Sequence, residues 1–481
     1  MWFRRDLRIA DNPALSAAHE SGRPIVALYV HDETLEGRAQ GGASLWWLDK
    51  SLRALEARLK DRGLRLIVRA GQCEAELRKV VEEAGANALY ANRLFEPEAA
   101  ARDRDIVHGL EQDGVTCKAW NGSLLCPPGS VLNGSGEPYK VYSPFAKALL
   151  RELELPPERL GPRLMSCAAA GLESESIESL GLHPKDPDWS SGFADWLPGE
   201  EGAKDQLSRF LKSGMKNYPE RRDIPSDSSG TSRLSAHLHF GEIAPWTLVR
   251  RAREAAGSNG ATSKDAEKFI SEVLWREFSW HLLHHFPHLP ERNFRPEFDA
   301  MPWRDARAAL TAWKRGRTGY PIVDAGMREL WATGYMHNRV RMIVASFLIK
   351  HLMIDWREGE AWFWDTLVDA DLGNNAQNWQ WVAGSGADAA PYFRVFNPVT
   401  QGEKFDAEGR YVRQWVPELA RLSDRWIHKP WEATHEVLAD AGVRLGDTYP
   451  KPIVDHSEAR QRALDAFSAL PRSGGTGLER A

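Results

Sequence analysis

The sequence contains little cysteine and no long apolar segment. Its four cysteines, Cys73, Cys117, Cys126 and Cys167, are widely spaced and form no CxxC pair, a pattern that fits neither a disulfide framework nor a zinc site. The longest apolar run, MIVASFLI at residues 342–349, is too short to span a bilayer. The N-terminus, MWFRRDLR, lacks the apolar core and cleavage site of a signal peptide. We therefore expect a cytoplasmic protein without a membrane segment.

Two phosphate-binding fingerprints are also missing, since neither GxGxxG nor GxxxxGK[ST] occurs. The net charge of -5 argues against a wholly basic surface for nucleic acid, but it does not exclude one positive face. Three basic clusters could form such a face, although each taken singly is better explained as solvated surface. They are Arg221 with Arg222, Lys314 with Arg315 and Arg317, and Arg339 with Arg341.

The first 120 residues alternate short apolar runs with helical patterns. The apolar runs are PIVALYV, LRLIVRA, ALYANRLF and VTCKAW, and SLWWLDKSLRALEARLKDRG and EAELRKVVEEAG have helical periodicity. This alternation predicts an α/β domain with a parallel, Rossmann-like sheet over residues 1–125. A chain that begins Met1-Trp2-Phe3 leaves little room for an opening strand, as expected if the natural N-terminus extends further.

The remainder divides into a connector and a helical domain. Residues 126–201 are rich in Gly, Pro and Ser, which predicts a long surface connector. From residue 202 to 470 strand signals nearly vanish, helical periodicity dominates, and most of the 20 tryptophans occur. We expect an all-α domain there, followed by a disordered tail over residues 471–481.

Polar residues with a chemical use occur at two places in the helical domain. The stretch GTSRLS begins a predicted helix, where hydroxyls and free backbone N–H groups suit a phosphate but equally suit an ordinary N-cap. In YMHNRVRM, Asn338, Arg341 and Met342 share one face of an otherwise apolar helix. A buried Arg341 needs a carboxylate, for which Asp369 and Asp371 are candidates, and a purely structural salt bridge is the alternative.

A further helix, EKFISEVLWREFSW, carries Phe269, Glu272, Trp275 and Arg276 on one stripe. A carboxyl group beside apolar rings could donate a hydrogen bond, but in isolation this stripe is better explained as core packing with a glutamate at its rim. Four histidines follow it in HLLHHFPH, but no carboxylate or cysteine motif accompanies them. We therefore predict no metal site.

Together these stretches resemble the photolyase/cryptochrome family over nearly the whole chain. The resemblance rests on WFRRDLRIADNPAL, GTSRLS, WREF, TGYPIVDAGMREL, YMHNRVRM, DWREGE, NNAQNWQW and FNPVTQGEKFD. It is greatest to bacterial photolyases that repair cyclobutane pyrimidine dimers and lie close to the plant-cryptochrome branch. The resemblance implies light-driven repair of UV-damaged DNA by electron transfer from excited, reduced FAD to a flipped-out lesion.

The same resemblance implies the roles of individual residues. FAD would be bound by Tyr218, Thr231, Ser232, Arg233, Leu234, Ser235, Phe269, Arg341, Asp369, Asp371 and Asn375. Electrons for flavin photoreduction would pass through Trp303, Trp356 and Trp379. The lesion would meet Glu272, Asn338 and Met342, and DNA would meet Arg222, Trp275, Arg276, Arg339 and Trp381. Asn375 would face the flavin N(5), where an uncharged amide suits a reduced, anionic ring and favours repair over signalling.

Two relatives in the family imply other functions. Enzymes that repair (6-4) photoproducts carry histidines where this chain has Asn338 and Met342, and His337 alone does not restore that pair. A cryptochrome, a blue-light receptor without repair, is the second alternative, since SLWWLDKSL, HLHFGEIAP and FWDTLVDADL resemble plant cryptochromes. Asn375 and Met342 argue against it.

The resemblance leaves the second chromophore open. Family members often carry an antenna, either a folate such as methenyltetrahydrofolate or a deazaflavin. The cysteine-lysine pair that contacts folate in one subgroup is missing from HLPERNFRP. Tyr335 and Phe269 also stand where many relatives have tryptophan. We expect a monomer that binds UV-damaged DNA.

Overall fold

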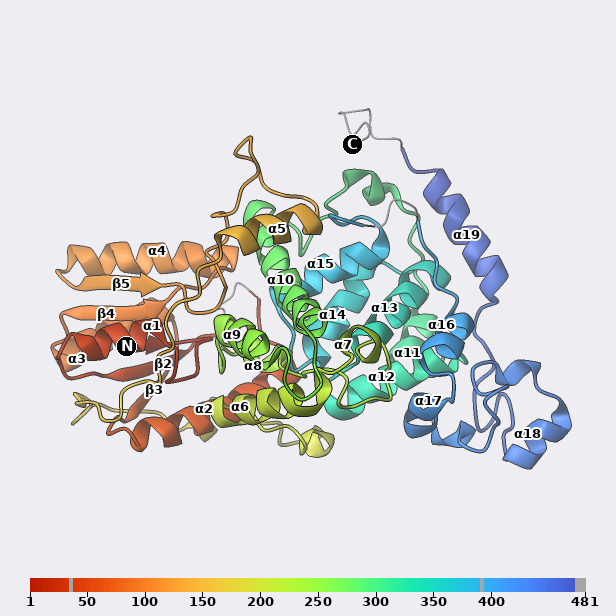
Figure 1. Cartoon of the computed structure of the whole chain (residues 1–481), viewed down its shortest axis with the longest axis horizontal. Coiled ribbons are helices and arrows are strands. Elements are labelled where there is room, and N and C mark those ends of the chain that lie inside the picture. Colours follow the sequence, from red (N-terminus) through yellow and green to blue (C-terminus); the bar gives the residue numbers. More distant parts are fainter. Residues whose placement is uncertain (34–37, 390–392, 472–481) are drawn as a thin grey trace. The chain divides into compact units, whose positions relative to one another are not determined.

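The N-terminal part of the chain is built on a parallel sheet, as predicted. The computed structural model describes residues 1–33, 38–389 and 393–471. Five strands pair in the order β3-β2-β1-β4-β5, and every pairing is parallel. They are β1 (Trp2–Phe3), β2 (Ala27–His31), β3 (Leu66–Ala70), β4 (Ala88–Asn92) and β5 (Thr116–Trp120) (Figure 1). The four predicted strands are confirmed. The N-terminal residues, where little room for a strand was expected, form β1, a strand of two residues at the centre of the sheet.

Alternation along the strands divides the core of this domain into two layers. Phe3, Tyr29 and Val68 point into one cluster with α1 (Pro13–Glu20) and α2 (Gly42–Lys60). Trp2 and Ile67 point into the other with α3 (Cys73–Ala84) and α4 (Pro97–Gln112). Successive strand residues face opposite sides of the sheet, so both faces carry apolar side chains. Helices cover both faces and bury these side chains.

The predicted connector contains more structure than its composition indicates. Within residues 126–201 lie α5 (Tyr142–Glu152) and two short 3-10 helices, Ile177–Leu180 and Ser190–Phe193. Helix α5 packs on α10 (Ser263–His285) and buries Phe145 and Leu149. It forms because YSPFAKALLRE is amphipathic.

The rest of the chain is helical, which confirms the predicted fold class. Beyond β5, the described residues contain helices and only isolated β-bridges. The remaining α-helices are α6 (Glu200–Arg209), α7 (Tyr218–Arg221), α8 (Ser235–His239), α9 (Pro245–Ala255), α11 (Arg307–Lys314), α12 (Pro321–Thr333), α13 (Asn338–Ser346), α14 (Trp356–Thr366), α15 (Leu372–Ala383), α16 (Pro398–Phe405), α17 (Arg410–Trp415), α18 (His435–Ala441) and α19 (His456–Ser468). A π-helical turn, Phe347–His351, continues α13.

Two compact units divide the chain. The first contains Met1–Arg221, Ser229–Pro287 and Asp365–Gly373, and the second contains Arg222–Ser228, His288–Trp364 and Asn374–Ala481. The boundary passes through α14 and α15. The predicted domains, 1–125, 126–201 and 202–470, describe fold type rather than compactness and remain a prediction. Most of the predicted disordered tail lies outside the described residues.

Helix α10 begins with a capping box. The Thr262 hydroxyl accepts a hydrogen bond from the Asp265 N–H at 3.2 Å, and the Asp265 carboxylate accepts one from the Thr262 N–H at 2.8 Å. The same carboxylate accepts from the Tyr218 N–H at 3.1 Å. One side chain therefore holds the start of α10 and the start of α7 together.

Replacing Thr262 with Ala should lower the stability of the protein by about 1 kcal/mol, because the Asp265 N–H at the helix start loses its partner. The decrease would appear as a lower midpoint of thermal unfolding followed by circular dichroism. Thr262→Ser keeps the hydroxyl and should behave like the parent protein. Equal loss in both variants would contradict the capping role.

Candidate functional site

The loop before α8 carries the hydroxyls predicted to meet a phosphate. The Gln206 side chain donates to the Ser232 carbonyl at 2.8 Å, which anchors the loop on α6. Arg233 has a left-handed backbone with φ of 51°, unusual for a residue with a side chain, and its guanidinium lies 4.4 Å from the centre of the Trp196 ring. Leu234 occupies the N-cap position. The stretch therefore does not provide an ordinary side-chain N-cap.

Ser235 instead connects α8 to the segment between α14 and α15 that contains Asp369 and Asp371. Its hydroxyl donates to the Asp369 carboxylate at 2.6 Å. The second predicted acid, Asp371, is buried and lies 3.6 Å from Nδ1 of His239, one turn along α8. Three predicted cofactor residues, one hydroxyl and two acids, thus lie on or against α8 within the first unit. Thr231 and Ser232 lie half-buried just before this helix.

Two aromatic residues predicted to pack against the flavin also meet in the first unit. The rings of Tyr218 and Phe269 are buried and lie edge to face at 5.8 Å. Phe210 contacts both rings, at 5.4 Å and 4.7 Å. Phe269, which stands where many relatives have tryptophan, therefore still belongs to an aromatic cluster.

The stripe of α10 that is predicted to meet the substrate presents an ion pair and a stacked ring. The Glu272 carboxylate lies 2.7 Å from the Lys268 ammonium, and both side chains are partly exposed. The Trp275 indole stacks on Tyr142 of α5, with 3.7 Å between ring centres and 6° between ring planes. Arg276 points elsewhere, because it donates to the Ser123 carbonyl at 2.9 Å and pairs with Glu277 at 3.4 Å.

The Arg276 guanidinium is held in place by its ion pair with Glu277. The Glu277 carboxyl is buried and accepts a hydrogen bond from the Leu125 N–H at 2.8 Å. Burial raises the pKa of Glu277 to about 7, although the Arg276 charge opposes this shift. The guanidinium compensates a buried acid, so the structure gives no support to its predicted contact with DNA.

In the second unit, several predicted DNA residues gather around one acid. Asp223 lies 2.8 Å from the Arg339 guanidinium and 3.7 Å from that of Arg222. Arg339 also contacts the Met342 sulfur at 3.8 Å. Asn338, at the first position of α13, is exposed. The structure thus groups the basic and apolar residues that resemblance assigns to the lesion side.

Arg341 is half-buried on the same helix. Its Nε donates to the Met336 carbonyl at 2.7 Å, and its guanidinium lies 5.4 Å from the centre of the Tyr335 ring. Tyr335 therefore supplies an aromatic face where many relatives have tryptophan. Pairing of Arg341 with Asp369 or Asp371 stays a prediction.

The side chain of Asn375 is held in one orientation. Its Nδ2 donates to the Glu360 carbonyl at 3.1 Å and to the Glu360 carboxylate at 2.8 Å. Both atoms of Glu360 are acceptors, so the amide nitrogen of Asn375 must face them. The Asn375 carboxamide oxygen is consequently the atom left to meet a ligand.

The three predicted electron-transfer tryptophans differ in burial. Trp379 is 3% exposed and Trp356 is 0% exposed, whereas Trp303 is half-buried. Trp379 lies edge to face with Phe363 at 5.0 Å and Trp313 at 6.3 Å. The Trp356 indole donates to the Asn293 side chain at 3.0 Å.

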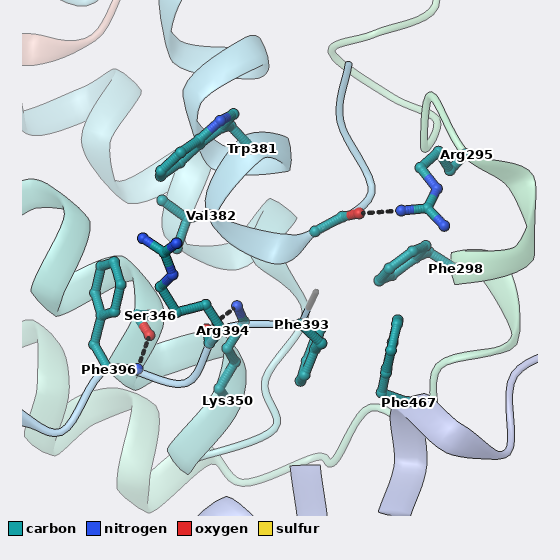
Figure 2. A pocket seen from close by; sticks show the side chains of 11 residues that line it. Arg295, Phe298, Ser346, Lys350, Trp381, Val382, Phe393, Arg394, Phe396 and Phe467 are labelled. Atoms are coloured by element: carbon teal, nitrogen blue, oxygen red, sulfur yellow. Dashed lines mark hydrogen bonds between the residues drawn. The ribbon is translucent and has the colours of Figure 1, made fainter. Parts of the chain in front are cut away.

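Trp381 lies at one side of a small cavity in the second unit (Figure 2). The cavity has a volume of about 70 Å³, and Arg394, Phe393 and Lys350 also line it. The buried Lys350 ammonium donates to the Arg394 carbonyl at 2.5 Å, and burial lowers the pKa of this lysine to about 7. The Trp381 indole N–H donates to the Asp388 carbonyl at 2.9 Å, which fixes the ring at the rim.

Four residues of these clusters were missed by sequence reasoning. Tyr142 lies in the segment interpreted as connector, and only its helical pattern could have indicated a structured position. Lys268 stands four residues before Glu272, a spacing that indicates an ion pair on a helix. Asp223 and Glu360 gave no signal, since Arg339 and Asn375, which they bind, lie farther along the chain than helical spacing reaches.

Three further features of the described part of the chain concern metal ligands, apolar helices and cysteines. The His, Cys, Asp and Glu side chains there form no group of three or more able to hold a metal ion. None of the helices described is both long and apolar enough to cross a membrane. All four cysteines are free thiols.

Comparison with known proteins identifies the class that this combination of α/β sheet and helical domain defines. A model of DNA photolyases matches residues 1–163, and a model of the FAD binding domain of DNA photolyase matches residues 269–469. The deoxyribodipyrimidine photo-lyase of Agrobacterium fabrum is 49% identical over 98% of this chain and 98% of its own length. Cryptochrome-1 of Arabidopsis thaliana is 38% identical over 98% of this chain and 70% of its own length.

A solved structure agrees with these sequence matches. The crystal structure of a bacterial class III photolyase from Agrobacterium tumefaciens superposes with a TM-score of 0.94 at 49% identity, covering 97% of this chain and 96% of that one. The chain therefore belongs to the photolyase/cryptochrome family, and FAD is its cofactor. Both the family and the cofactor agree with the sequence analysis.

The position of Trp379 depends on a glycine of α14. A Cβ atom at Gly359 would lie 2.1 Å from Cη2 of the Trp379 ring and 2.6 Å from a methyl group of Leu348. Replacing Gly359 with Ala should therefore displace the indole and lower stability by about 1 to 3 kcal/mol, as overpacking does. Thermal unfolding of the FAD-loaded protein measures the loss.

Gly134 provides the matched control, because a Cβ atom there would meet nothing within 4 Å. Gly134→Ala should leave unfolding unchanged. A Gly359→Ala variant as stable as this control would show that Trp379 is not confined by α14.

Proposed function

We propose that this protein repairs cyclobutane pyrimidine dimers in UV-damaged DNA by light-driven electron transfer from bound, reduced FAD. The observation that carries this proposal is the fixed carboxamide of Asn375, whose oxygen is available because Glu360 holds its nitrogen. The reduced flavin carries a hydrogen on N(5), whereas the oxidised ring has a lone pair there. An acceptor oxygen at this place stabilises the reduced ring, the state that repair requires.

The residues that resemblance assigns to FAD carry side chains that suit its chemical groups. We propose that the hydroxyls of Thr231, Ser232 and Ser235 meet the diphosphate, and that the loop conformation at Arg233 and Leu234 presents them. The Asp369 and Asp371 carboxylates and the Arg341 guanidinium would hold the polar edge of the ring system. Tyr218 and Phe269 would supply aromatic packing against it.

A second set of residues is proposed to contact the damaged bases and the DNA backbone. Trp275, Trp381 and Met342 would contact the apolar faces of a flipped-out dimer, and Glu272 and Asn338 would bind its polar edges. Arg222 and Arg339, held together by Asp223, would meet phosphates. Arg276 is left out of this set because its guanidinium is bound to Ser123 and Glu277.

When bound, reduced and excited FAD supplies one electron that returns after the dimer has split. The protein positions the dimer, excludes water from it, and stabilises the negative charge that the pyrimidine carbonyls gain. Trp379, Trp356 and Trp303 would carry electrons inward to restore the reduced flavin. The half-buried Trp303 is the member of this series best placed to accept an electron from solution.

The (6-4) alternative is weakened by the state of His337. This side chain is buried, its Nδ1 accepts a hydrogen bond from the Arg339 N–H at 3.2 Å, and burial lowers its pKa to about 4. A histidine with a pKa this low is mostly neutral at physiological pH and is a poor proton donor. The cryptochrome alternative is favoured by the similarity to Arabidopsis Cryptochrome-1, but Asn375 and Met342 oppose it.

We also propose that the protein is a monomer in the cytoplasm, a setting consistent with its four free thiols. A folate or deazaflavin antenna remains a prediction.

The function is tested with an oligonucleotide that contains one thymine dimer. Purified protein loaded with FAD and chemically reduced should restore intact thymines under blue light and not in the dark. Products are separated by chromatography. Loss of FAD binding and absence of repair are scored separately, so a reduced holoprotein that repairs nothing would favour the cryptochrome function.

Replacing Trp379 with Phe should slow photoreduction of oxidised FAD by an external thiol by about tenfold or more, because the electron path loses its innermost carrier. Repair by chemically reduced enzyme should be unaffected, since that reaction does not use the path. Absorbance of the flavin under illumination follows the first reaction. Trp426→Phe is the control, because Trp426 is a half-buried tryptophan outside this series whose ring lies beside Arg425. Equal photoreduction in both variants would exclude the proposed path.

A further inference from the structure

Helix α10 presents three chemically different groups along one face. Lys268, Glu272 and Trp275 are spaced by four and three residues, so their side chains lie one above another on the same side of the helix. Lys268 and Glu272 form an ion pair of 2.7 Å, with side-chain exposures of 34% and 27%. An ion pair this exposed contributes little to the stability of the protein. Stability therefore gives no reason for the presence of Lys268 and Glu272 at these positions.

The aromatic part of this face is held rigidly. Tyr142 stacks on Trp275, and its hydroxyl donates to the Ser271 carbonyl at 2.8 Å, on the turn that also carries Glu272. Burial raises the pKa of Tyr142 to about 12, and the nearby charge of Glu272 adds to this shift. The hydroxyl therefore keeps its proton and its bond to Ser271, and Tyr142 fixes the Trp275 ring next to the ion pair.

The ion pair offers one acceptor and one donor. An ionised carboxylate can only accept hydrogen bonds, and an ammonium group can only donate them. The edge of a thymine ring presents an N3–H donor flanked by carbonyl acceptors. A base lying on the α10 face could therefore give its N3–H to Glu272 and receive a hydrogen bond from Lys268 at the adjacent carbonyl.

We propose that Lys268 is a further catalytic residue, whose ammonium group hydrogen-bonds a carbonyl of the pyrimidine dimer while Glu272 binds the neighbouring N3–H. This inference rests on the proposed repair function. After one electron enters the dimer, negative charge develops on that carbonyl and the ammonium stabilises it. The two carbon-carbon bonds that join the pyrimidines break, the electron returns, and Lys268 keeps all its protons. Its role is electrostatic, with no net transfer of protons or electrons.

The test compares Lys268→Met, which removes the donor and keeps an unbranched side chain, with Lys268→Arg, which keeps a donor. Lys264→Met is the matched control, since Lys264 is an exposed lysine in the first turn of the same helix. Each FAD-loaded, chemically reduced protein is assayed for repair quantum yield at saturating thymine-dimer oligonucleotide. Affinity is measured for the same oligonucleotide with and without the dimer.

Lys268→Met should lower the quantum yield about threefold or more and weaken binding of the dimer about tenfold, as expected for loss of one hydrogen bond to a charged donor. Affinity for undamaged DNA should match that of Lys264→Met, and Lys268→Arg should recover most of both losses. FAD content and thermal unfolding should equal those of the control.

Three outcomes would overturn the proposal. A Lys268→Met variant that repairs and binds like Lys264→Met would exclude any contact with the lesion. Equal weakening for damaged and undamaged DNA would make Lys268 a phosphate contact. Weaker binding with an unchanged quantum yield would exclude the catalytic role. Absence of repair by the parent protein would instead refute the proposed function itself, so the two failures are distinguishable.

Discussion

The carboxylate of Asp265 is the constraint that positions the residues of the first unit proposed to contact the substrate. It accepts hydrogen bonds from the N–H of Thr262 and the N–H of Tyr218, so it sets where α10 starts and where Tyr218 lies. A buried carboxylate without such partners would carry a large desolvation cost, whereas here the main chain supplies them. Because α10 is continuous from Ser263 to His285, the positions of Phe269, Glu272 and Trp275 follow from where it begins.

In the second unit, Glu360 likewise fixes the position of another residue. It contacts no cofactor group in the proposed arrangement, yet it determines which atom Asn375 presents. A similar division appears where Asp223 holds Arg222 and Arg339 together. In both cases an acid orients the side chain that would contact the ligand, which limits the conformational freedom lost on binding.

Much of the fold could be predicted from the sequence because it is encoded locally. Strand runs and helical periodicity identified the parallel sheet, α10 and α13, and the spacing of Asn338, Arg341 and Met342 correctly indicated one helix face. Contacts between distant segments could not be predicted in this way. The stacking of Tyr142 on Trp275 and the bond from Ser235 to Asp369 depend on tertiary packing, for which a single sequence has no periodic signal. The N-cap alternative for GTSRLS failed because Leu234, which has no hydroxyl group, occupies the N-cap position of α8.

Helix α5 gives part of the connector, residues 126–201, a structural role. A long irregular segment would be a neutral place to lengthen or cut the chain, but Tyr142 begins α5 and its ring backs the indole proposed to meet DNA. The connector therefore consists of two parts with different tolerance to engineering. A tag or cleavage site after α5, where Leu160 and Leu164 are exposed, leaves this contact intact. The same change just before Tyr142 would disturb the first residue of α5, whose ring and hydroxyl contact Trp275 and Ser271 of α10.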